Sequence, residues 1–74
     1  MFALNMSSRY IIMTPQKIKN LRKDIGDTQK NFAKRLGFTS YITVSRWERG
    51  IQKPNPSALI LLEQLQKEVN NGKN

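Results

Sequence analysis

Three glycines divide much of the chain into short segments of helical character. Gly26, Gly37 and Gly50 each follow a stretch in which apolar side chains recur at three- and four-residue spacing, the period of one helix face. Glycine readily adopts the left-handed conformation that ends many helices. The first two stretches are preceded by Thr14 and Thr28, whose hydroxyl groups can cap a first helical turn. The pattern predicts an all-α fold built from short helices.

The same signals give approximate helix boundaries. The first helix should cover residues 15–25, with Pro15 at the first helical position, where its missing N–H costs nothing. The two prolines at 54 and 56 place a loop before the last helix. The predicted architecture is a compact bundle of four helices, or five. The three later helices are expected over residues 29–36, 40–48 and 56–69.

Residues 1–13 stand apart from this helical pattern. Within them, Arg9–Met13 is the segment with strand character. The extension is therefore either a short ordered arm or strand, or a disordered leader ahead of a natural start at Met13. The domain itself is expected over residues 14–70, and residues 71–74 should fray.

The positive charge is concentrated in the middle of the chain. The 74 residues carry 13 Lys and Arg and 5 Asp and Glu, for a net charge of +8 at pH 7. Ten of the basic side chains and three of the acids fall within residues 17–53. A field focused on one segment suits a polyanion, either nucleic acid or an anionic membrane surface.

A membrane association has little support. The longest apolar run, Ala58–Leu62, is far shorter than the roughly 20 residues of a spanning helix. The N-terminus lacks the charged start and long apolar stretch of a signal peptide. We therefore expect a cytoplasmic protein with nucleic acid, and no membrane, as its partner.

Missing residue types exclude several kinds of chemistry. The sequence has no Cys and no His, so it offers no disulfide, no thiol nucleophile and no histidine for proton transfer. Zinc loses its two commonest ligands. The five carboxylates form no obvious catalytic pair. We expect no enzyme activity, no metal site and no cofactor.

The second and third predicted helices form a candidate helix-turn-helix. They are short and are joined by a turn that contains Gly37, as in that motif. Ala33 is small enough for the next helix to cross close over it. Val44 and Trp47 should bury the back of the third helix, so its outer face can enter the major groove of DNA. The side chains predicted on or near that face are Tyr41, Ile42, Ser45 and Arg46.

Two runs of residues resemble the Xre/Cro family of lambda-repressor-like DNA-binding domains. They are TQKNFAKRLG at residues 28–37 and TVSRWERG at residues 43–50, with Lys53-Pro54 following. The resemblance covers about residues 14–65. It implies a lambda-repressor-like fold and a sequence-specific, double-stranded DNA-binding transcriptional regulator that acts as a repressor.

The resemblance also implies roles for single residues. Arg22 and Glu48 match an ion pair that ties the first helix to the third. Gln29 matches a phosphate-contacting glutamine at a helix N-terminus. The base contacts expected from the resemblance are Tyr41, Ile42, Ser45 and Arg46. The expected contacts to the DNA backbone are Thr28, Gln29, Lys30, Ser40, Thr43, Arg49 and Lys53.

Two departures from the family pattern carry structural expectations. Eleven positions separate Ala33 from Val44, where the family usually has ten, and the extra residue is most simply Thr39. The third helix should then be shifted or tilted, with Ser40 as its cap. Asp27 stands where an apolar residue is common, which predicts a looser join between the first two helices.

The last helix carries more apolar residues than one helix face can bury. Its stripe of Ala58, Leu62, Leu65 and Val69 leaves Ile60 or Leu61 pointing elsewhere. Exposed apolar surface of this kind marks a contact site, so we expect a homodimer through this helix. The alternative is that the first helix and the loop at residues 51–56 cover the whole run.

Two other functions compete with that of a DNA-binding regulator. One is an antitoxin or protein-interaction module that binds a toxin protein and uses DNA binding for autoregulation, which the apolar last helix suits. The other is an RNA-binding domain. It has less support, because the six aromatic residues are scattered and form no stacking platform for single strands.

Overall fold

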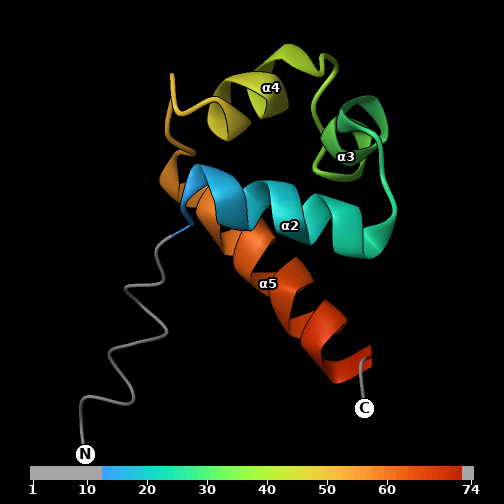
Figure 1. The fold of residues 1–74 in the computed structure, drawn as a ribbon. Coiled ribbons are helices and arrows are strands. Elements are labelled where there is room, and N and C mark those ends of the chain that lie inside the picture. Colours follow the sequence, from blue (N-terminus) through green and yellow to red (C-terminus); the bar gives the residue numbers. More distant parts are fainter. Residues whose placement is uncertain (1–12, 73–74) are drawn as a thin grey trace, which may run out of the picture.

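The computed structural model describes residues 13–72 and contains four helices. They are α2 (Pro15–Ile25), α3 (Gln29–Arg35), α4 (Ile42–Glu48) and α5 (Pro56–Gly72). Helix α2 contacts both α4 and α5, and α3 contacts α4 (Figure 1). Residues 13–72 contain no strand, which confirms the predicted all-α fold. Within the same residues, no helix has the length and apolar character needed to cross a membrane.

Helix α2 begins and ends where the sequence signals place it. The Thr14 hydroxyl accepts a hydrogen bond from the Lys17 N–H at 3.1 Å, and Pro15 follows at the start of the helix. Gly26 closes the helix in the left-handed conformation, at φ 92°. This conformation lets the Gly26 N–H reach the carbonyl of Arg22 at 3.0 Å, which satisfies an acceptor in the last turn.

Helix α4 begins later than predicted. It starts at Ile42 rather than at residue 40, and Tyr41 occupies the capping position without a side-chain hydrogen bond. The Ser40 hydroxyl accepts from the Ile42 N–H at 3.1 Å, so Ser40 lies in the turn and caps from one residue farther back. The extra residue therefore lengthens the turn rather than the helix. Helix α5 continues to Gly72, beyond the predicted end at Val69.

The predicted arm or strand over residues 1–13 lies outside the described residues, apart from Met13. Met13 precedes α2 and is buried against the core.

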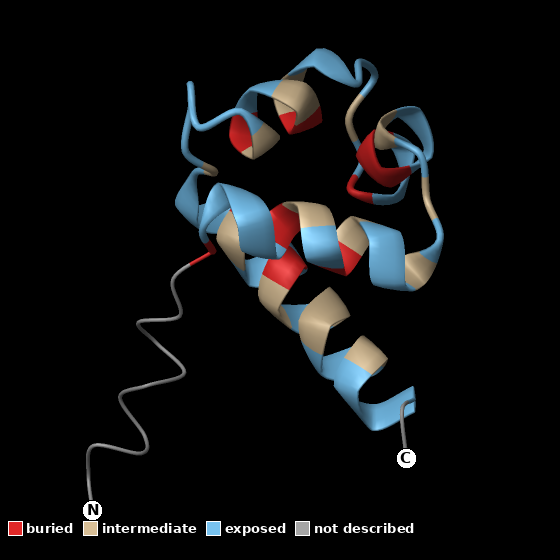
Figure 2. Ribbon diagram, viewed as in Figure 1, coloured by how far each residue is buried: buried red, intermediate tan, exposed pale blue. Residues whose placement is uncertain are grey.

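The core forms where the buried faces of the four helices meet (Figure 2). Phe32 and Val44 are fully enclosed, and Trp47 is 2% exposed. The Trp47 ring packs edge-on against Phe38, with ring centroids 5.6 Å apart. The core residues from Met13 to the last helix are Met13, Ile18, Leu21, Phe32, Ala33, Leu36, Val44, Trp47, Ala58 and Leu62.

Helix α5 divides its apolar residues between the core and the surface. Ala58 and Leu62 are buried, and Leu65 and Val69 pack partly against the core. Ile60 is 58% exposed. This confirms that one stripe faces inward and that the first helix and the loop do not cover the whole apolar run.

Candidate nucleic-acid interface

The outer face of α4 carries the side chains predicted to meet DNA. Val44 and Trp47 are directed to the core, and a helix that buries one face leaves the opposite face in solvent. Tyr41 and Ile42 are 51% and 44% exposed. Arg46 is exposed, and Ser45 is half-buried. The four side chains predicted to contact bases are therefore all at least partly accessible, three on α4 and Tyr41 at the capping position before it.

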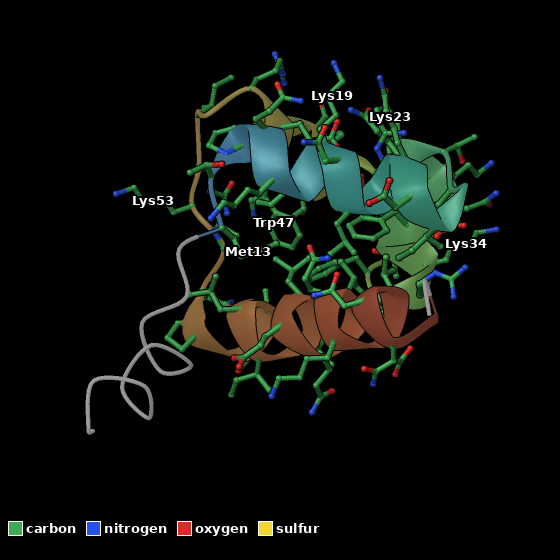
Figure 3. All side chains as sticks on the ribbon, turned by 60° about the horizontal axis from the view of Figure 1, so that its bottom comes forward. Met13, Lys19, Lys23, Lys34, Trp47 and Lys53 are labelled. Atoms are coloured by element: carbon green, nitrogen blue, oxygen red, sulfur yellow. The ribbon has the colours of Figure 1, made fainter. Side chains whose placement is uncertain are left out.

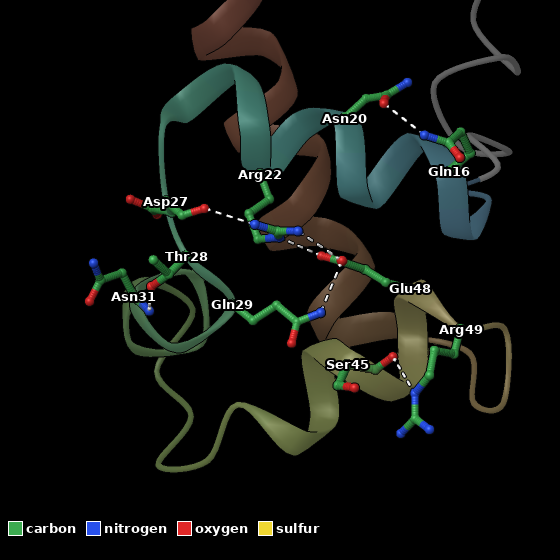
Figure 4. Close-up of polar contacts among 10 residues, drawn as sticks. All are labelled: Gln16, Asn20, Arg22, Asp27, Thr28, Gln29, Asn31, Ser45, Glu48 and Arg49. Carbon is green, nitrogen blue, oxygen red and sulfur yellow. Dashed lines mark hydrogen bonds and ion pairs between the residues drawn. The ribbon is translucent and has the colours of Figure 1, made fainter.

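A polar network fixes α4 relative to the two helices that precede it (Figure 4). Arg22 of α2 donates to the two carboxylate oxygens of Glu48, from Nε at 2.7 Å and from Nη2 at 3.1 Å. Gln29, the first residue of α3, donates from Nε2 to Glu48 Oε1 at 3.1 Å. The ion pair implied by the family resemblance is present. The hydrogen bond from Gln29 to the same carboxylate also ties the start of α3 to the end of α4.

Gln29 is therefore held in place by the protein itself. Its amide group has two N–H donors, and one of them is used by Glu48. The second N–H of the same amide could donate to an outside acceptor, such as a phosphate oxygen. An amide fixed in this way loses less conformational freedom on binding than a free one.

The electrostatics of Glu48 reflect two opposing effects. Burial raises the pKa of its carboxyl group, but hydrogen bonds from Arg22 and Gln29 and the nearby positive charges outweigh burial. The pKa of Glu48 therefore lies below its ordinary value of 4.5. The pKa of Arg22 is raised, chiefly by the hydrogen bond to Glu48. Both groups are charged at neutral pH.

We expect acid to weaken the fold partly through Glu48. Its pKa is lower in the folded state, so its stabilising contribution is complete above the unfolded pKa of the carboxyl group and is lost as the pH falls through the folded pKa. The Glu48→Gln variant should be less stable at pH 7. Its free energy of unfolding should also fall less between pH 5 and pH 3, as measured by urea titration.

The control for this experiment is Glu63→Gln. The Glu63 carboxylate forms a long 3.6 Å pair with Lys67 on the same helix, and the Lys67 side chain is 66% exposed. This variant should keep the stability and pH dependence of the unmodified chain. Equal loss of stability on acidification in the Glu48→Gln variant and the unmodified chain would contradict the role of Glu48.

Asp27, which was expected to loosen the join between α2 and α3, is ion-paired with the last residue of α3. Its carboxylate accepts from Arg35 Nε at 2.7 Å and from Arg35 Nη2 at 3.1 Å. Its backbone carbonyl accepts from Arg22 Nη1 at 3.0 Å. The hydrogen bonds from Arg35 hold the pKa of Asp27 below its ordinary value. Asp27 thus connects the turn after α2 to the end of α3 through a two-point ion pair.

The predicted backbone contacts lie on several elements. The Thr28 hydroxyl accepts from the Asn31 N–H at 3.1 Å and caps α3. Arg49, in the turn after α4, donates from Nε to the Ser45 carbonyl at 3.4 Å (Figure 4). Lys30 and Lys53 are exposed, and Thr43 is half-buried.

Lys19 was not among the residues predicted from the sequence. Its positive charge contributes to the lowered pKa of Glu48, so it lies on the side of α2 that faces the polar network. The available signal was its position three residues before Arg22, because residues at this spacing share one helix face. Lys19 therefore adds a positive charge on α2 that acts on Glu48 at the end of α4.

Comparison with known families agrees with this geometry. The family model described as helix-turn-helix, of the Xre/Cro type, matches residues 18–65, which include the whole of α3 and α4 and most of α2. No curated protein matches the chain, and no solved structure matches it. On the family match and the arrangement of its helices, the chain belongs to the Xre/Cro-type helix-turn-helix family of DNA-binding regulators.

Proposed function

We propose that this protein is a sequence-specific transcriptional repressor that inserts α4 into the major groove of double-stranded DNA. The observation that carries the proposal is the division of α4, which buries Val44 and Trp47 and exposes Ile42 and Arg46. The major groove admits a single helix, whose outer side chains then meet base edges. We propose the cytoplasm as the place where this regulator acts.

The exposed side chains of α4 suggest distinct roles in base recognition. Arg46 can bond a guanine through two atoms, and Ile42 can pack on a thymine methyl group. Tyr41 lies next to Ile42 in the chain and Ser45 lies next to Arg46, and each adds a hydroxyl group. Affinity would come from contacts to the DNA backbone, which position the protein without reading its sequence. The proposed backbone contacts are Lys19, Thr28, Gln29, Lys30, Ser40, Thr43, Arg49 and Lys53.

The Arg46→Ala variant tests this assignment. We expect it to lose preference for one base pair of the selected site, with a loss of about 10- to 100-fold in discrimination. Sites should be selected from random duplex DNA with the unmodified chain and with the variant. The control is Lys67→Ala on α5, which removes the same charge from a distant exposed position. If Arg46→Ala selects the same site as the unmodified chain, Arg46 is not a base reader.

We further propose that the repressor acts as a homodimer through α5. Ile60 and Leu61 are 58% and 39% exposed, and no described residue covers them fully. A two-fold dimer would present two α4 helices to half-sites about 34–36 Å apart. The single domain is small, so contacts in a dimer would add to a modest core.

The Ile60→Asp variant tests the dimer. A charge at the centre of an apolar contact should convert the protein to a monomer in sedimentation experiments at high micromolar concentration, with its helix content unchanged. The Asn70→Asp variant, which introduces the same charge at an exposed position on α5, should remain a dimer. If the unmodified chain is a monomer under these conditions, the dimer is wrong.

The exposed apolar residues of α5 also suit a second candidate function. In that case the protein is an antitoxin, and Ile60 and Leu61 bind a toxin protein rather than a second copy. Co-purification of a neighbouring gene's product with the unmodified chain, and its loss with Ile60→Asp, would favour this function over the homodimer.

A further inference from the structure

The turn after α4 presents an apolar side chain to solvent. Ile51 is 64% exposed, more than any other large apolar side chain among residues 13–72. Gln52 and Lys53, which follow it, are also exposed. In Figures 1 and 3 the first part of this loop lies beside α4, on the opposite side of α2 from α5. The loop therefore borders the helix that the proposed function turns toward DNA.

Hydrogen bonds to the end of α4 fix the backbone at Ile51. The Ile51 N–H donates to the Arg46 carbonyl at 3.0 Å, and the Gly50 N–H donates to the Trp47 carbonyl at 3.1 Å. This pair of bonds is the Schellman closure of a helix, with the glycine in the left-handed conformation, here at φ 76°. A Cβ at Gly50 would lie 3.5 Å from Pro15 Cγ, so the turn also rests against the start of α2. Ile51 is thus held in a defined position although its side chain is exposed.

The corresponding residue after α3 is covered by the protein. Phe38 follows the glycine that closes α3, and its N–H donates to the Ala33 carbonyl at 2.9 Å. The Phe38 ring is half-buried and packs edge-on against Trp47. An apolar residue at this position of the closure often packs against its own helix. Ile51 occupies the same position and is mostly exposed, so its apolar surface is available to a partner.

The charges around Ile51 indicate the class of partner. Arg49 and Lys53 lie two residues before and two residues after it, and both are exposed. Figure 3 shows the Lys53 side chain directed away from the protein. Residues 49–62 include no acid, and the side chain of Glu48, just before them, is 5% exposed. An apolar side chain between two basic ones matches the DNA backbone, in which the carbon atoms of each deoxyribose lie between two phosphates.

We propose that Ile51 packs on a deoxyribose of the DNA backbone, between two phosphates bound by Arg49 and Lys53. This inference rests on the proposed function and adds to it an apolar contact that contributes affinity. Sugar contacts position a protein on the duplex and carry no base information. Loss of the contact should therefore weaken binding to all duplexes alike. It should leave the salt dependence unchanged, because an apolar side chain releases no counterions from the phosphates.

Three substitutions at Ile51 test the contact. The Ile51→Ala variant should bind the selected site and an unrelated duplex about fivefold more weakly for each bound protomer, roughly the effect of burying one methylene group. Ile51→Val keeps a branched apolar side chain and should retain most of the affinity. Ile51→Thr has nearly the shape of valine but carries a hydroxyl group, and it should bind as weakly as Ile51→Ala. All three should keep their helix content, because the side chain is exposed and the backbone makes the hydrogen bonds to α4.

Lys53→Gln is the matched control in the same loop. It removes a phosphate contact, so it should reduce the slope of affinity against salt on logarithmic axes by about 0.9 for each bound protomer, whereas Ile51→Ala should not change that slope. Fluorescence anisotropy at several salt concentrations measures both quantities.

The outcomes separate this inference from the proposed function. If the unmodified chain binds its selected site and the Ile51→Ala variant binds it equally well, the inference is overturned and the proposed function stands. Full affinity in the Ile51→Thr variant also overturns the inference, because the contact would then not be apolar. A loss confined to the selected site overturns it as well, because Ile51 would then read a base, such as a thymine methyl group. If the unmodified chain binds no DNA, the proposed function and this inference both fall.

Discussion

Replacing Arg22 with methionine is expected to lower the free energy of unfolding by about 3 kcal/mol, because it leaves the buried carboxylate of Glu48 without its charged partner. The side chains of Arg22 and Glu48 are 13% and 5% exposed and are joined at 2.7 Å. Methionine fills a similar space but offers Glu48 no positive charge and no donor. Urea titration at pH 7 measures the loss.

A double variant separates two causes of this loss: the unpaired charge of Glu48 and the loss of packing around Arg22. Changing Glu48 to leucine in the Arg22→Met background should restore much of the stability, because replacing both partners of a buried ion pair by apolar residues is often neutral. The control is the Glu63–Lys67 pair, in which the Lys67 side chain is 66% exposed, and Lys67→Met should cost less than about 0.5 kcal/mol. A loss below about 1 kcal/mol for Arg22→Met would show that Glu48 is solvated instead.

The helices could be predicted from the sequence where the signal is local. Thr14 and Gly26 cap α2 at its two ends through contacts within a few residues, so the sequence alone defined this helix. The start of α4 was predicted too early because Ser40 looked like a capping residue. The Ser40 hydroxyl does accept a hydrogen bond from the first turn, but from the N–H of Ile42, two residues later. Tyr41 lies between them and belongs to the longer turn.

The contacts between helices could be predicted only in part. The Arg22–Glu48 pair followed from the family resemblance, because its two residues occupy positions 26 apart in sequence that no local rule connects. The pairing of Asp27 with Arg35 was missed. The two residues lie eight positions apart, and their meeting depends on the angle at which α3 leaves the turn after α2. That angle is a property of the folded chain.

The candidate site was predictable at the level of a helix face. Burial of Val44 and Trp47 determines which residues of α4 reach solvent, and apolar spacing alone revealed that burial. The hydrogen bond from Gln29 to Glu48 was not predictable. This hydrogen bond joins side chains on two different helices. A glutamine or a glutamate in a sequence does not by itself indicate which residue it will bond.

Raising the salt concentration from 50 to 200 mM is expected to weaken DNA binding by about 10⁴-fold if the protein binds as a dimer. Each phosphate neutralised by a basic side chain lowers the affinity as salt rises, with a slope of about −0.9 per contact on logarithmic axes. The proposal assigns four basic contacts to each protomer: Lys19, Lys30, Arg49 and Lys53. A dimer would therefore neutralise about eight phosphates, whereas a monomer would neutralise about four and lose about 100-fold.

Single substitutions extend this measurement to individual side chains. Lys30→Gln should reduce the steepness of the salt dependence by about one unit for each bound protomer, with the base preference of the protein unchanged. Lys67→Gln, on α5, should leave the slope as it is. Affinities measured by fluorescence anisotropy at several salt concentrations give these slopes directly. A change of less than tenfold over the whole range would contradict the assigned phosphate contacts, because even a single protomer with these four contacts releases enough counterions to exceed it.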